Sequence, residues 1–279
     1  MANVRLHRIK SLSGFRRIAA VAWPAPRSPT TYGTIQIRAE PLLAWLEEQN
    51  RSGAVKVTVT HAVARAVAMV LRKHPDVNAF VRWGRVVQRQ DVDVFMHVMV
   101  PREDNGAGLG GADLSGVVVR HADEKSTSVI AEELREGAAR IRAGNDEDFQ
   151  RTKAQALMLP PLVMGWVLRL IEFLQFSLNL NTAPIGAPRD PFGSVLLTSV
   201  GMLGLDIGYA PFFPLARTSV VLMVGAVKDA VLPENGRPVV AKMLALNATL
   251  DHRVIDGYHA SILAKEIRGL LENPQRLCL

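Results

Sequence analysis

One short stretch near the C-terminus, NATLDHRVIDGYHAS (Asn247–Ser261), gathers side chains that can exchange protons. Asp256 follows His252 by four residues and His259 follows it by seven. A histidine can take a proton from a thiol or a hydroxyl near neutral pH, so His252 is a candidate general base. The alternative is a polar turn, in which Asp256 serves only as the N-cap of the next helix.

The elements on either side of this stretch would place His252 at an edge of a sheet. Apolar residues alternate over Met243–Leu250, which predicts a strand with one face in the core. The segment Ile255–Glu272 carries apolar residues at helical spacing and ends before an Asn-Pro pair, which predicts a helix. A side chain at this strand-to-helix junction is open to a substrate.

The rest of the chain predicts a single α/β domain over residues 1–279. Helical periodicity marks three further segments, Pro41–Glu48, His61–Lys73 and Ser126–Ala143. Strand patterns mark five more, Tyr32–Ile37, Val92–Val100, Gly116–Val119, Ser194–Val200 and Ser219–Val227. The elements intermingle without a strict βαβ rhythm, so we expect a sandwich built on one mixed sheet.

The most apolar segment, Leu157–Leu180, predicts a helical insertion at about 151–192. A Pro-Pro pair at 160–161 divides it into a short arm and a longer helix. Polar residues interrupt it at helical spacing, at Arg169, Glu172 and Gln175. Its weakly basic flanks favour a helix buried against the body or in a subunit interface. The alternatives are a membrane-surface helix and a lid over the substrate.

Composition indicates an ordinary globular protein with surplus positive charge. The formal net charge is +7, with 48% hydrophobic and 21% charged residues. Phosphate groups or an anionic membrane suit this charge better than nucleic acid, because no basic run carries interleaved aromatics. Charge alone favours a simpler alternative, in which the excess is spread over the solvated surface. The single cysteine, Cys278, and an N-terminus without a signal-peptide core predict a cytoplasmic location, with peripheral membrane contact through 157–180 as the alternative.

The heptapeptide DHRVIDG (Asp251–Gly257) closely resembles the signature of the dihydrolipoyl acyltransferases, the E2 components of 2-oxo acid dehydrogenase complexes. Other resemblances follow in the family's order, at Leu12–Ala19 (LSGFRRIA), Val55–Ala79, Val117–Gly144 and Val195–Asp206 (VLLTSVGMLGLD). The resemblance implies the two-layer α/β sandwich of chloramphenicol acetyltransferase and a trimeric building block. It also implies a free-standing catalytic domain, since no lipoyl or subunit-binding domain is recognisable.

The resemblance further implies acyl transfer between a coenzyme A thioester and an acceptor thiol or hydroxyl. His252 would be the base, and Thr198 would donate a hydrogen bond to the tetrahedral oxyanion. A one-residue slip in the alignment would put Ser199 in that role, and Gly201 would form the turn beside the substrate. The implied cofactors are coenzyme A and a lipoyl group on another protein, with no metal.

Asp256 matches a family residue that an N-terminal arginine holds in place, and Arg16 is the best match for that arginine, with Arg17 second. The family's active site lies between subunits, so His252 and Thr198 are expected to meet from different chains of a homotrimer or of a higher multiple of trimers. Tyr258 replaces a small residue of E2 enzymes. It either narrows the thiol tunnel or packs as core, whereas His259 has no assigned role.

Two other functions remain as alternatives. The chain could be the catalytic E2 component of a dehydrogenase complex that uses a lipoyl domain in trans. It could also be a non-catalytic scaffold or a membrane-associated assembly protein. The joint presence of His252, Thr198, Asp256 and an N-terminal arginine favours an enzyme, because a scaffold does not need the set.

Overall fold

The computed structural model describes residues 28–101, 112–143, 160–213 and 215–278. Its main sheet consists of β1 (Thr30–Arg38), β4 (Val94–Pro101), β5 (Ala112–Val119), β6 (Val195–Ser199), β7 (Val220–Glu234) and β8 (Arg237–Asp251). The strands lie in the order β1-β8-β7-β6-β4-β5. Strand β6 is parallel to both of its neighbours, and the other pairs are antiparallel. The predicted mixed sheet is therefore confirmed.

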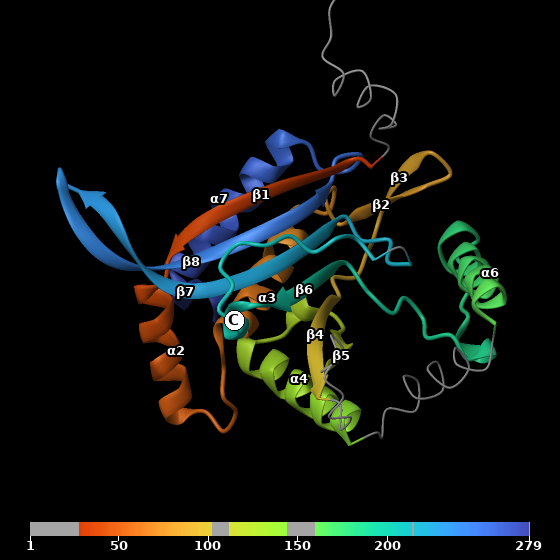
Figure 1. Cartoon of the computed structure of the whole chain (residues 1–279), viewed down its shortest axis with the longest axis horizontal. Coiled ribbons are helices and arrows are strands. Elements are labelled where there is room, and N and C mark those ends of the chain that lie inside the picture. Colours follow the sequence, from red (N-terminus) through yellow and green to blue (C-terminus); the bar gives the residue numbers. More distant parts are fainter. Residues whose placement is uncertain (1–27, 102–111, 144–159, 214, 279) are drawn as a thin grey trace, which may run out of the picture.

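Helices pack together on one face of this sheet (Figure 1). They are α2 (Glu40–Ser52), α3 (Val59–Lys73), α4 (Thr127–Arg142) and α7 (Gly257–Glu272). Short 3-10 turns are found at Ala122–Glu124, Ala183–Ile185, Gly201–Leu203 and Pro274–Leu277. Each of the four predicted helices is present, and α3 is buried along most of its length because its small and β-branched apolar residues meet both the sheet and the other helices.

The two faces of the sheet are covered unequally. In β6, Val195 and Leu197 belong to the large core under the helices, whereas Leu196 belongs to a small cluster on the opposite face. Strand side chains alternate between faces, so this small cluster marks the face on which none of the described helices packs, called the helix-free face below. The loop after β6 lies over part of that face, where the Thr249 hydroxyl donates to the Ala210 carbonyl at 2.8 Å.

A second, two-stranded sheet was not predicted from the sequence. It is the hairpin of β2 (Ala79–Arg82) and β3 (Arg85–Gln88). Its turn residues Trp83 and Gly84 both have positive φ, 51° and 72°, which suits the right-handed twist of a tight hairpin. Each strand is only four residues long, and this is too short for alternation to stand out in the sequence.

The apolar segment forms α6 (Pro161–Glu172), followed by a π-helical turn over Phe173–Ser177. The helix begins at the predicted break, and the short arm before it lies outside the described residues. Helix α6 stands apart from the main sheet in Figure 1, and Trp166 is 72% exposed. The expectation that this helix is buried against the body of its own chain is therefore wrong. Over the part of the chain that the structure describes, no helix is long and apolar enough to cross a bilayer.

Candidate active site

His252 lies just after the end of β8, as predicted, and its side chain is exposed. Its backbone N–H donates to the carbonyl of Pro29 at 2.8 Å, which ties the residue to the start of β1. Its ring Nδ1 lies 3.0 Å from the carbonyl oxygen of Ile255. A carbonyl only accepts, so Nδ1 carries the hydrogen and Nε2 keeps the lone pair that a general base needs.

An open cavity of about 400 Å³ lies beside this ring, between His252 and the segment Ser28–Thr31. Arg253 also lines it and is clamped to Asp251, with Nη2 2.6 Å from Oδ2 and Nε 2.9 Å from Oδ1. The hydrogen bond that Arg253 donates to Asp251 raises the pKa of Arg253. This two-point contact fixes the backbone on both sides of His252 and so sets where the imidazole stands.

Asp256 is the N-cap of α7, and its Oδ1 accepts a hydrogen bond from the His259 backbone N–H at 2.9 Å. That hydrogen bond is the main reason why the pKa of Asp256 is lowered. The ring of His259 adds Nδ1 to the same oxygen at 2.7 Å and reaches Asp76 through Nε2 at 3.3 Å. The capping interpretation of Asp256 is confirmed, and His259 supports it. Arg16 and Arg17 lie outside the described residues.

Tyr258 points into solvent from the first turn of α7 and is 72% exposed. The interpretation that it packs as core is therefore wrong for this chain alone. Its position after the motif leaves it free to meet a substrate or a neighbouring subunit.

Thr198 lies next to the end of β6 and is half-buried. By strand alternation it shares the helix-free face with Leu196, whereas Ser199 turns toward the helices. Gly201 forms the turn that follows, and a Cβ there would lie 2.7 Å from the carbonyl oxygen of Gly225. Only glycine allows the turn to lie this close to β7, so Gly201 sets the position of the strand end that bears Thr198.

The strand register separates Thr198 from His252 within one chain. Thr198 lies opposite Met223, and Met223 lies opposite Asn247. His252 is five residues beyond Asn247, which corresponds to about 17 Å along the strand direction. A single subunit therefore does not bring the two side chains together.

His97 is a neighbour of Thr198 that the sequence did not single out. His97 follows Met96 on β4, and Met96 pairs with Leu197 on β6. The next pair in the same register is His97 and Thr198. Burial lowers the pKa of His97, and its Nδ1 lies 3.4 Å from the carbonyl oxygen of Leu197. The lone histidine in an apolar strand gave no signal of its own, because β4 and β6 are about a hundred residues apart in the chain.

Comparison with known proteins places this geometry in a family. The model of the 2-oxoacid dehydrogenases acyltransferase (catalytic domain) matches residues 7–153 and 192–279. The acetyltransferase component of the acetoin cleaving system of Bacillus subtilis is 25% identical over 96% of this chain. Component 3 of the mitochondrial pyruvate dehydrogenase complex of Arabidopsis thaliana is 26% identical over 96% of it. The chain spans 56% and 42% of these two proteins, respectively.

Solved structures agree on the fold. A probable dihydrolipoamide acetyltransferase of Listeria monocytogenes superposes with a TM-score of 0.62 at 16% identity, covering 96% of this chain and 95% of the other. The dihydrolipoamide acetyltransferase of Azotobacter vinelandii gives a TM-score of 0.63 at 19% identity, covering 90% and 84% of the two chains. The predicted fold class is thus confirmed, and because the family match covers well over half of the sequence, the chain belongs to the 2-oxoacid dehydrogenase acyltransferase family through its catalytic domain.

Proposed function

We propose that this domain transfers an acyl group between a coenzyme A thioester and an acceptor thiol or hydroxyl. The observation that carries the proposal is the setting of His252. Its Nδ1 donates to the Ile255 carbonyl, and its Nε2 is left to accept a proton beside an open cavity. A surface histidine without a fixed tautomer would not favour proton abstraction in this way.

The reaction follows from this arrangement. Nε2 of His252 takes the proton of the acceptor, and the resulting thiolate or alkoxide attacks the thioester carbonyl. The tetrahedral oxyanion accepts a hydrogen bond from the Thr198 hydroxyl of a neighbouring subunit. Collapse of the intermediate expels the coenzyme A thiolate, which recovers the proton from the imidazolium. Asp251 and Asp256 hold the backbone around the base and do not exchange protons with the substrate.

Relatives support this assignment. In the Azotobacter enzyme, the residues investigated for the catalytic mechanism include a histidine and an asparagine four positions apart, the same spacing as His252 and Asp256. The curated relatives are named dihydrolipoyllysine-residue acetyltransferases. Their names favour a second candidate, in which the acceptor is a dihydrolipoyl group carried by a separate protein.

Coenzyme A release from acetyl-CoA, measured with dihydrolipoamide and with a panel of thiol and hydroxyl acceptors, tests the proposal. His252→Ala should lower turnover by about a hundredfold to ten-thousandfold, since a general base typically contributes that much. Because His252 is exposed, the variant should unfold at the wild-type temperature, and this is the control for folding. If His252→Ala released coenzyme A at the wild-type rate, or if the wild type released none with any acceptor, the chain would be a scaffold and not this enzyme.

A further inference from the structure

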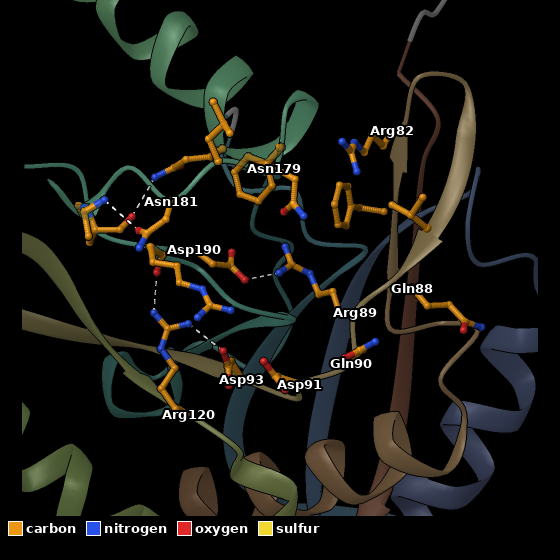
Figure 2. Close-up of a pocket in the computed structure, with 18 of the residues that line it drawn as sticks. Arg82, Gln88, Arg89, Gln90, Asp91, Asp93, Arg120, Asn179, Asn181 and Asp190 are labelled. Carbon is orange, nitrogen blue, oxygen red and sulfur yellow. Dashed lines mark hydrogen bonds and ion pairs between the residues drawn. The ribbon is translucent and has the colours of Figure 1, made fainter. Parts of the chain in front are cut away.

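A cavity with a volume of about 1030 Å³ lies away from His252. Its walls are the β2–β3 hairpin with the loop that follows, the adjacent ends of β4 and β5, and residues 175–190 (Figure 2). The size is that of a small-molecule site. Residues 175–190 fall within 154–191, which the family match leaves uncovered, so the cavity depends on a part of this chain that the family pattern does not include.

Arginines line the cavity on all three walls, at Arg82, Arg89, Arg120 and Arg189. Two of them are neutralised in place, because Arg89 pairs with Asp190 and Nη1 of Arg120 lies 2.7 Å from Oδ2 of Asp93. Arg82 uses only its Nε, which donates to the Ser177 carbonyl at 3.0 Å. Its terminal nitrogens make no hydrogen bond within the described residues, and neither does the side chain of Arg189.

The central ion pair is incompletely satisfied. Nε of Arg89 and Oδ1 of Asp190 are buried, and neither has a hydrogen-bond partner among the described residues. Buried polar atoms are nearly always paired, so an unpaired donor and an unpaired acceptor in the cavity wall are unusual. Figure 2 shows the Asn179 side chain directed toward Arg89, where its amide adds a further donor and acceptor.

The Arg89 side chain is held rigidly. Its guanidinium carbon lies 5.1 Å from the ring centroid of Phe80 and 5.9 Å from that of Phe176. Its Nη2 donates to the Arg217 carbonyl at 3.1 Å. A cation fixed in this way needs no rearrangement to meet a ligand.

The backbone around the cavity is strained. His121, Asn179 and Asp190 line it with φ values of 48°, 58° and 38°, and Trp83, next to Arg82, has a φ of 51°. They are four of the five non-glycine residues with positive φ among those described; the fifth lies in the β7–β8 turn. Such conformations cost on the order of 1–3 kcal/mol each and cluster at ligand sites.

We propose that this cavity binds an organic phosphate of nucleotide size. The guanidinium fork matches phosphate oxygens, and Arg82 and Arg189 are the lining arginines without an ion pair among the described residues. The lining amides and the Asp190 carboxylate suit the hydroxyl and amino groups of a sugar or a base. Inorganic phosphate would leave most of the 1030 Å³ empty.

Such a ligand has two sources, the nucleotide end of coenzyme A or a separate organic phosphate that acts as an effector. The register aligns the start of β4 with the starts of β6 and β7 and with the end of β8, so the cavity and His252 share one end of the sheet. Three strand spacings separate them, about 14 Å. The inference goes beyond acyl transfer, and its test is a binding measurement that needs no catalysis.

The test is calorimetric titration of the full chain with adenosine 5′-monophosphate. We expect saturable binding that weakens about tenfold or more in Arg189→Gln and in Arg82→Gln, because each loses a charged hydrogen bond. Arg85→Gln is the matched control. Arg85 is exposed on the same hairpin and outside the cavity, so the identical loss of charge there should change the affinity less than twofold.

Three results would overturn the site: no saturable binding, an equal loss in Arg85→Gln, or inorganic phosphate binding as tightly as the nucleotide. Arg189 is exposed, so its variant should fold even if Arg82→Gln loosens the hairpin. Kinetics then separate the two sources. A raised KM for acetyl-CoA in Arg189→Gln and competitive inhibition by the nucleotide identify the coenzyme. An unchanged KM in Arg189→Gln, although nucleotide binding to this variant is weakened, identifies an effector.

Discussion

At the level of single residues, the proposed base and the proposed oxyanion donor are held in different ways. His252 is oriented by one hydrogen bond from its Nδ1 to a carbonyl three residues ahead. Thr198 is positioned by strand alternation and by the close approach of Gly201 to β7. The sequence predicts which elements carry both residues. The tautomer of His252 and the sheet face of Thr198 depend on three-dimensional contacts, which the sequence pattern does not show.

Substitution of the two neighbouring hydroxyl residues distinguishes their roles. Thr198→Ala should lower turnover by about a hundredfold, because an oxyanion loses one hydrogen bond that forms in the transition state. Ser199→Ala should stay within about twofold of the wild type, since Ser199 turns to the helix side of the sheet. Steady-state rates of coenzyme A release measure both. The reverse order would mean that the alignment is displaced by one residue.

At the level of elements, the N-terminus of α3 is capped by a residue that can bind a proton, His61. The Thr58 backbone N–H donates to Nδ1 of His61 at 3.1 Å, and burial lowers the pKa of His61 to about 4 from its ordinary value near 6.5. A histidine whose pKa is lowered by folding makes its full contribution to the free energy of unfolding above pH 6.5. That contribution is lost as the pH falls from 6.5 toward 4, because the unfolded chain then binds a proton that the folded chain excludes.

His61→Gln should therefore flatten the pH dependence of stability. Glutamine can make the same capping contact but does not titrate. We expect the drop in the free energy of unfolding between pH 7 and pH 5 to shrink by about 1–2 kcal/mol, as measured by urea denaturation at each pH. His121→Asn, a change at an exposed histidine with φ of 48°, should leave the drop as it is in the wild type. An equal drop in His61→Gln would show that His61 titrates normally in the folded chain.

At the level of the whole molecule, the register separation of Thr198 and His252 requires a second subunit for the proposed chemistry. The helix-free face carries Thr198, and α6 exposes Trp166 and Leu170 by 72% and 57%. Exposed apolar surface of this kind is typical of interaction sites. We therefore expect a homotrimer or a multiple of it, with each site shared between two chains.

Mixing two inactive variants tests the shared site. His252→Ala and Thr198→Ala each remove one half, but a mixed assembly contains interfaces in which an intact His252 faces an intact Thr198. The co-expressed variants should therefore turn over faster than either variant alone. Light scattering checks that the mixed particles have the wild-type mass. A monomer, or an assembly without recovery, would contradict a site between subunits.

The sequence by itself determined the helices, the strands of the main sheet and the motif around His252, because these depend on local apolar periodicity and on contiguous residues. It did not reveal the β2–β3 hairpin, whose strands are too short for a clear pattern. Only the tertiary structure decided that one chain keeps Thr198 and His252 apart, and that Arg89 meets Asp190 at a cavity. Those relations arise from strand register and from packing between segments about a hundred residues apart, and neither leaves a periodic signal in the chain.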